Sequence, residues 1–214
     1  MKKKLIIGGV ALIAGLCLIF GVVQIFNNNK SRDIVIVEGE DEEVPLADEI
    51  PSAAMTQDEL NQLLQTELAK CPEAVLTSLY ADGWKIVLTE ENLSDKYFQG
   101  IYSTVNAVTD STIKTIWIAN TQRAIEKSTL HEIGHYLDWK FGIINTSSEF
   151  QKIYADEKAN FKLVSGSSAY AKTSSQEYFG EAFHQCIINP DGMMQNNPKT
   201  YAFIMAMVNQ LSEQ

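Results

Sequence analysis

The motif His-Glu-x-x-His at residues 131–135 constrains this chain more than any other feature of its sequence. Residues four apart lie one above the other on the same face of an α-helix, so His131 and His135 can offer two imidazoles to one metal ion. Glu132, next to the first histidine, can reach a water molecule bound to that metal. The flanking residues contain no proline and have apolar residues at helical spacing, which predicts a helix over residues 124–141. The motif therefore predicts a zinc site suited to the hydrolysis of a peptide bond.

A third metal ligand must come from elsewhere in the chain, because a catalytic zinc site has three protein ligands and one open position. The extended motif that supplies a third histidine requires glycine and histidine at positions 138 and 141. The chain has Asp138 and Phe141 there, which excludes that class of peptidase. A later predicted helix instead carries Glu177, Glu181 and His184 on one face.

Residue spacing leaves the choice between the two acids open. Glu177 also completes the capping-box pattern Ser174-x-x-Glu177, in which its side chain would bond to the start of its own helix. Glu181 is about as good a ligand candidate by spacing alone. His184 is predicted to be an ordinary residue of this helix rather than a ligand.

Two stretches of the chain together resemble a known family. The first is residues 131–138, His-Glu-Ile-Gly-His-Tyr-Leu-Asp. The second is residues 170–183, with Tyr170 seven residues before Glu177, an aromatic pair after that glutamate, and then a second glutamate. Both are similar to the catalytic domain of the anthrax lethal factor-type zinc metallopeptidases, a family that includes secreted proline-proline endopeptidases. Residues 197–204 resemble the final helix of the family, so the resemblance extends over the chain beyond its first 52 residues.

The resemblance implies a metalloendopeptidase with one zinc ion per chain and a gluzincin-like His-His-Glu ligand set. Gly180 stands where alanine is more usual in the family, and this departure puts little of the assignment in doubt. The implied zinc ligands are His131, His135 and Glu177. The resemblance also implies that Glu132 is the general base, that Tyr170 stabilises the oxyanion and that Glu181 orients a ligand histidine. Asp138, one turn beyond His135, either does similar work or has an N-terminal or surface role.

The pattern of the remaining chain predicts an α+β fold that is mostly helical, with a small sheet before the motif helix, and the resemblance implies that the fold is of the zincin type. Capping boxes begin predicted helices at Thr56-x-x-Glu59 and at Thr146-x-x-Glu149. The helix over about 175–188 is predicted to end in a turn at residues 189–192, and Pro198 to open the last helix.

Strands are predicted at residues 84–89 and 112–118, and residues 109–111 are predicted to interrupt the apolar stretch before the second. This second strand comes just before the motif helix, and a strand near the metal of a peptidase can pair with an extended peptide substrate. Residues 33–37 are either a short strand or part of a linker.

The first 30 residues are predicted to be a membrane anchor or signal segment. Three lysines precede Leu5–Phe26, a span of 22 residues without charge that is long enough to cross a bilayer. Lysines before the span and none directly after it place the N-terminus in the cytoplasm and the rest outside. We therefore expect a single-pass protein of the cell membrane with an extracellular catalytic domain. Secretion after cleavage of a signal peptide is the alternative.

Residues 31–52 are rich in acidic side chains and contain prolines at 45 and 51, which is typical of a solvated linker. The metallopeptidase domain is accordingly predicted to span residues 53–214. Cys71 and Cys186 either form a disulfide or are small buried residues.

The net charge of −10 argues against nucleic acid as a partner, because phosphate contacts need a basic surface. The expected partner is instead a peptide or protein substrate, in particular a surface or secreted protein. The alternative function is a membrane-anchored binding or adhesion module with an inactive metallopeptidase fold. The intact motif residues argue against this alternative.

Overall fold

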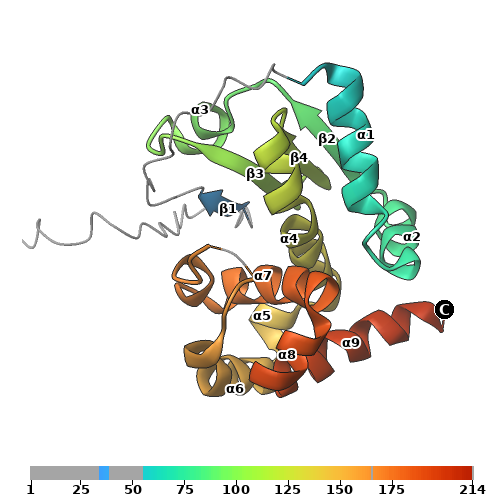
Figure 1. The fold of residues 1–214 in the computed structure, drawn as a ribbon, viewed down its shortest axis with the longest axis vertical. Helices are drawn as coiled ribbons and strands as arrows, with labels where there is room; N and C mark the ends of the chain where they lie inside the picture. The colour runs from blue at the N-terminus through green and yellow to red at the C-terminus, as the bar shows by residue number, and fades with distance from the viewer. Residues whose placement is uncertain (1–33, 39–54, 165, 214) are drawn as a thin grey trace, which may run out of the picture.

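The computed structural model describes residues 34–38, 55–164 and 166–213. These residues form a four-stranded sheet with the strand order β1-β3-β4-β2, and helices that extend from it into a second, helical half (Figure 1). In chain order the elements are β1 (Ile34–Glu38), α1 (Gln57–Leu68), α2 (Glu73–Ala81), β2 (Lys85–Thr89), α3 (Leu93–Phe98), β3 (Val105–Asp110), β4 (Thr115–Ala119), α4 (Gln122–Phe141), α5 (Ile143–Thr146), α6 (Ser148–Glu157), η1 (Lys158–Asn160), η2 (Tyr170–Lys172), α7 (Ser175–Ile188), α8 (Pro190–Asn196) and α9 (Pro198–Ser212). The predicted α+β class with a small sheet before the motif helix is confirmed.

The sheet combines parallel and antiparallel pairing. β3 lies antiparallel to both β1 and β4, whereas β2 lies parallel to β4. All six residues of β3 are buried, so this strand is covered on both faces. β4 is an interior strand whose two edges are taken by β3 and β2. The predicted strand at 112–118 starts later than expected, at Thr115. Because both of its edges are paired, β4 is an ordinary sheet strand without a free edge for a substrate.

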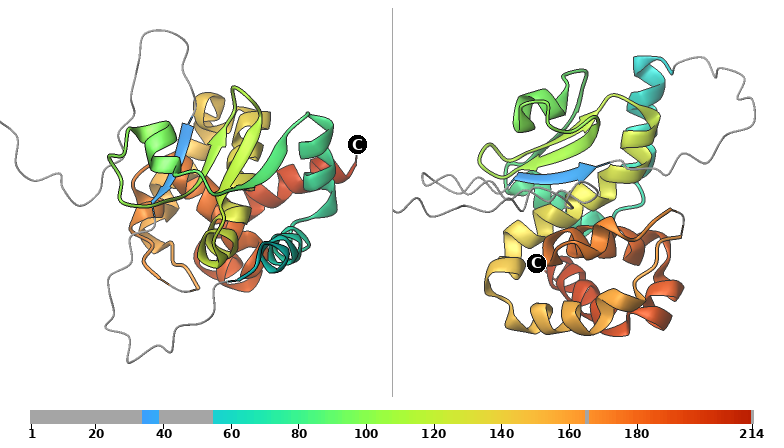
Figure 2. Two further views of the ribbon diagram at one scale, coloured as in Figure 1. Left: turned by 90° about the horizontal axis from the view of Figure 1, so that it is seen from above. Right: turned by 90° about the vertical axis from the view of Figure 1, so that its left-hand side faces the viewer.

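The motif helix α4 connects the two halves of the molecule. Thr121 caps its start by accepting a hydrogen bond from the amide of Ala124, and Gly142 ends it in the left-handed region with φ 63°. Its middle turns, from Ser128 to Asp138, are buried throughout. A helix buried on all sides belongs to the core, and α4 indeed lies between the sheet and the helical half (Figure 2).

α4 and α7 cross at two glycines. A Cβ atom on Gly134 would lie 2.8 Å from the Cα atom of Gly180, which is closer than side-chain carbons approach a backbone. Gly134 can therefore carry no side chain unless the two helices separate. This close approach brings the first turn of α7 against the motif face of α4.

A buried carboxylate joins the last helix to the helical half. Glu157, at the end of α6, accepts hydrogen bonds from the backbone amides of Lys199 and Thr200 and from the Thr200 hydroxyl. These amides belong to the first turn of α9, where backbone donors have no partner within the helix. Glu157 thus caps α9 from a different helix.

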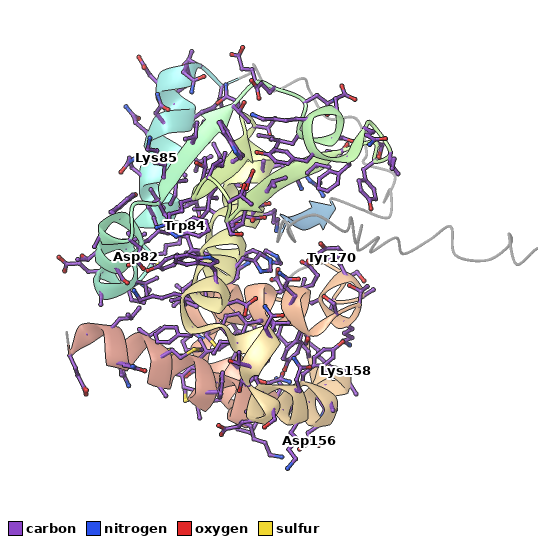
Figure 3. The ribbon with its side chains drawn as sticks, turned by 180° about the vertical axis from the view of Figure 1, so that it is seen from behind. Asp82, Trp84, Lys85, Asp156, Lys158 and Tyr170 are labelled. Carbon is purple, nitrogen blue, oxygen red and sulfur yellow. The ribbon has the colours of Figure 1, made fainter. Side chains whose placement is uncertain are left out.

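On the sheet side, Asp82 ties the end of α2 to α4. The Tyr136 hydroxyl and the Lys140 ammonium each donate to Asp82 at 2.7 Å, and the Trp84 ring packs edge-on against Tyr136. Figure 3 labels Asp82 and Trp84 on this side of the molecule. Partial burial raises the pKa of Asp82, but the bonds from Lys140 and Tyr136 outweigh this and lower it below its ordinary value. The last turns of α4 are held by these contacts.

Most of the local signals in the sequence lead to the expected element, and two do not. The capping box of Thr56 and Glu59 is formed, and Pro198 begins α9. In contrast, α6 is capped by Ser147 rather than by Thr146, which ends α5. The predicted turn at 189–192 is the start of helix α8, with Asn189 as its cap.

Three predictions concern the cysteines and the N-terminal region. Cys71 and Cys186 are buried and unpaired, and burial raises the pKa of each thiol to about 12. Within the described residues no helix is long and apolar enough to cross a membrane, and the predicted anchor Leu5–Phe26 lies outside them. β1 falls inside the predicted linker at 31–52, where it joins the sheet.

Candidate metal centre

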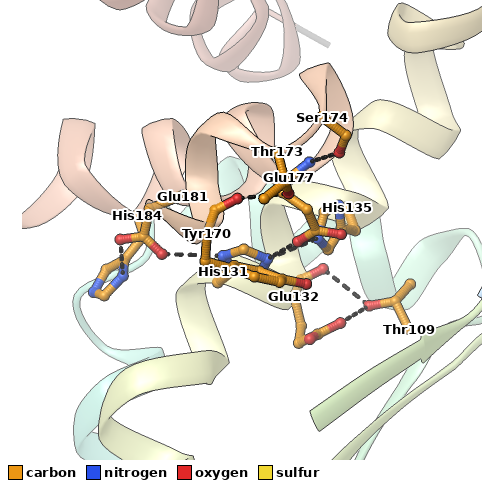
Figure 4. A network of polar contacts seen from close by, with 10 residues as sticks. All are labelled: Thr109, His131, Glu132, His135, Tyr170, Thr173, Ser174, Glu177, Glu181 and His184. Carbon is orange, nitrogen blue, oxygen red and sulfur yellow. Dashed lines mark hydrogen bonds and ion pairs between the residues drawn. The ribbon is translucent and has the colours of Figure 1, made fainter. Parts of the chain in front are cut away.

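The site is built from the buried middle of α4 and the first two turns of α7. His131 and Glu132 are fully buried and His135 is 2% exposed. Glu177 comes from α7 and is also buried. Ser174 caps that helix by accepting a hydrogen bond from the Glu177 amide, while the Glu177 carboxylate turns to the two histidines instead of back to the cap (Figure 4).

Three donor atoms of these residues converge. The Nε2 atoms of His131 and His135 are 2.8 Å apart. Oε2 of Glu177 lies 3.3 Å from the first and 3.8 Å from the second. The ligand atoms of a tetrahedral zinc site, with bonds of about 2.0–2.1 Å, are about 3.3 Å apart. The three side chains therefore have the spacing of a metal-ligand set, and all their donor atoms lie within 4.8 Å of one another.

Glu181, one turn further along α7, contacts the back of the first histidine. Its Oε2 lies 3.1 Å from His131 Nδ1, and its Oε1 lies 3.2 Å from His184 Nδ1 and accepts a hydrogen bond from Gln185. A carboxylate in this position keeps Nδ1 protonated and leaves Nε2 free to bind a metal. Glu181 is thus placed to orient His131, and His184 contacts Glu181 and lies outside the group of three donors.

Glu132 faces away from these donors, toward the sheet. Thr109 of β3 donates a hydrogen bond to Glu132 Oε2, and the same hydroxyl lies 3.3 Å from the Glu132 backbone oxygen. Among the described residues, Oε1 of Glu132 has no hydrogen-bond partner. One oxygen is therefore held by the sheet, and the other is free to take a proton.

Burial and the neighbouring charges shift the ionisation of the cluster in different directions. Burial raises the pKa of Glu132 to about 8 and lowers that of His135. Burial would also lower the pKa of His131, but its contacts with Glu177 and Glu181 raise it to about 10. Burial would raise the pKa of Glu177, yet the two imidazoles bring it to about 2. The buried carboxylates thus favour a positive charge at the point where the donors meet.

These observations fit a divalent metal ion. Two imidazole nitrogens and one carboxylate oxygen are a ligand set of catalytic zinc. Oε2 of Glu177 is buried and makes no hydrogen bond to any described residue, although a carboxylate oxygen left in that state is costly. A cation bound between the three donors would satisfy it.

The two other predicted site residues lie at the margins of this group. Tyr170 is half-buried in η2, which packs against α7, and Figure 4 draws its ring across the same cluster of side chains. Asp138 is buried, and its Oδ1 accepts a hydrogen bond from the amide of Ile144 at the start of α5. The role of Asp138 in orienting a ligand histidine stays a prediction.

A buried group made of the two histidines of a His-Glu-x-x-His helix and a glutamate of α7, with the glutamate of the motif beside it, defines a candidate metallopeptidase centre. Comparison with known proteins supplies the family. The family model described as anthrax toxin lethal factor, N- and C-terminal domain, matches residues 44–207. The chain belongs to this family, which confirms the resemblance seen in the sequence and supports a peptidase.

The fold is similar to that of a solved relative. The structure of the Pro-Pro endopeptidase PPEP-2 from Paenibacillus alvei matches with a TM-score of 0.56 and 19% sequence identity, covering 73% of this chain and 95% of that chain. A search of curated proteins found no match.

Two features of the site differ from what the sequence pattern indicates. The pattern places Thr109 in a turn between strands, whereas it is a buried residue of β3 in contact with Glu132. Gly180 looks inconsequential in the sequence, but a Cβ there would lie 2.8 Å from Cε1 of His135 and 2.9 Å from Nε2 of His131. Alanine at this position would require the two imidazoles or α7 to shift.

Proposed function

We propose that this protein is a zinc-dependent endopeptidase that binds one zinc ion per chain. The observation that carries the proposal is the convergence of three buried donors, on His131, His135 and Glu177. Beside them lies Glu132, one of whose carboxylate oxygens makes no hydrogen bond to any residue that the structure describes. Membership of the lethal factor family supports the same reaction class.

The proposed reaction assigns a task to each group of residues. His131, His135 and Glu177 would hold the metal, which when bound supplies Lewis-acid activation of water and of the scissile carbonyl. Glu132 takes the proton of the attacking water through its free oxygen and passes it to the leaving amine. The Tyr170 hydroxyl donates a hydrogen bond to the developing oxyanion, an interaction that strengthens in the transition state.

The proposed setting is the outer face of the cell membrane, with Leu5–Phe26 as anchor and a surface or secreted protein as substrate. This part of the proposal is supported by the uncharged N-terminal span and the lysines before it. Secretion after cleavage is the alternative, and the size of the mature chain extracted from cells distinguishes the two. The solved relative is named a Pro-Pro endopeptidase, so cleavage between prolines is a substrate preference to test here.

A peptide library incubated with the full chain tests the proposed activity. We expect cleavage that a chelator abolishes and added zinc restores. Glu132→Ala is the matched control, because it keeps the three donors and should retain zinc while losing turnover. Zinc binding without cleavage by the parent protein would refute the proposal and favour a binding module with an inactive fold.

A further inference from the structure

The strand β1, contributed by the N-terminal region, occupies the outer edge of β3. The two strands run antiparallel, and the register places Val35 opposite Thr109 and Ile36 opposite Val108. β3 would otherwise be the edge strand of the sheet, since its other side is taken by β4. The backbone groups along this edge of β3 are therefore paired with β1, which is distant in sequence from the rest of the sheet.

This edge is the one next to the proposed general base. Thr109, which pairs with Val35, is also the residue whose hydroxyl contacts the Glu132 carboxylate. The other edge of the sheet belongs to β2, two strands away from β3. Figures 1 and 2 both draw β1 between the sheet and the helical half that carries Glu177.

An edge strand can accept only one additional strand on its free side. Extended peptides commonly bind proteins by adding a strand to such an edge, where main-chain hydrogen bonds supply much of the affinity. A substrate that reached the metal centre in an extended conformation would use the outer edge of β3. In the structure, those backbone groups are already paired with Ile34–Glu38.

We infer that Ile34–Glu38 is an internal competitor for the substrate-binding edge of β3 and must leave it before a peptide can pair there. This inference rests on the proposed function. A covalently attached segment acts at an effective concentration in the millimolar range for short flexible tethers, so even a weak five-residue strand can compete with a dilute substrate. An edge strand of this length can also detach without disturbing the core.

Paired variants of the full chain test this inference. Val35→Pro combined with Ile36→Pro removes at least one hydrogen bond to β3, because successive amides point to opposite sides of a strand. Val35→Thr with Ile36→Thr is the matched control, since threonine retains a high strand propensity. Neither residue belongs to the proposed catalytic machinery.

Amide hydrogen exchange of residues 105–110 gives a result that does not depend on catalysis. We expect the outward-facing amides of β3 to exchange at least about tenfold faster in the proline variant than in the parent and in the threonine variant. Equal exchange in all three proteins would overturn the inference.

Peptide cleavage provides the second measurement. We expect KM of the proline variant to fall about threefold or more with kcat unchanged, because a larger fraction of molecules has a free edge. Faster exchange with an unchanged KM would overturn the competition. If no variant cleaves any peptide, the proposed function is wrong, and the exchange result alone then decides whether β1 occupies the edge.

Discussion

Replacing Glu181 by glutamine tests how strongly this residue supports the candidate metal centre. Oε2 of Glu181 lies 3.1 Å from Nδ1 of His131, and both side chains are largely buried. Glutamine has the same size but carries no charge, so it holds the Nδ1 proton of the histidine less strongly. Removing such a partner typically weakens metal binding about 10–100-fold, which corresponds to about 1.4–2.7 kcal/mol.

The assay is competition for zinc between the full chain and a chromophoric chelator. The matched control is Glu126→Gln, which makes the same chemical change on the exposed face of α4. We expect the control to bind zinc like the parent and Glu181→Gln to bind it about 10–100-fold more weakly. Equal dissociation constants for all three proteins would refute the argument that Glu181 orients His131.

Three further predictions concern the oxyanion donor, the helix crossing and the surface of α4. Tyr170→Phe should lower kcat about 100-fold or more with little change in KM, because the lost hydrogen bond forms mainly in the transition state. The control Tyr201→Phe should have the kcat and KM of the parent. An unchanged kcat in Tyr170→Phe would show that Tyr170 does not act in the active site. Gly180→Ala should weaken zinc binding in the same chelator assay, because the added Cβ would lie 2.8 Å from the His135 ring. We expect this loss even though alanine favours the helix by about 1 kcal/mol over glycine. Zinc affinity equal to that of the parent would contradict the close contact between Gly180 and His135. Asp82→Asn should lower the free energy of unfolding in urea by about 0.5–1 kcal/mol at pH 7. Since the folded pKa of Asp82 lies below the unfolded value, this loss should vanish as the pH falls below about 4 through the folded pKa, and a loss that is independent of pH would refute the assignment.

Features decided by a few neighbouring residues could be predicted from the sequence. The capping box of Thr56 and Glu59 and the position of Pro198 at the start of α9 each act within a single turn of helix. Candidate donors from α4 and α7 could likewise be identified by their spacing along each helix, but choosing between Glu177 and Glu181 needed more than spacing. In the structure Oε2 of Glu177 lies near the Nε2 atoms of both histidines, whereas Oε2 of Glu181 contacts Nδ1 of His131.

The remaining features depend on which elements meet, and local patterns contain little information about that. Both Thr146 and Ser147 can cap a helix, and the first is used to end α5. Thr109 resembles a turn residue because it adjoins Asp110 and Ser111, whereas its role follows from the packing of β3 on α4. A short run of four apolar residues such as the one in β1 is equally consistent with a linker until a partner strand is known.

Zinc titration of peptide cleavage, made in parallel on the parent chain and on Glu132→Ala, tests the central claim most directly. If the donors of α4 and α7 form one catalytic metal site, activity of the parent rises in proportion to added zinc and levels off at one equivalent per chain. Glu132→Ala then binds the same single equivalent without cleaving. Cleavage that is independent of zinc, or cleavage by Glu132→Ala at the parental rate, would contradict the claim.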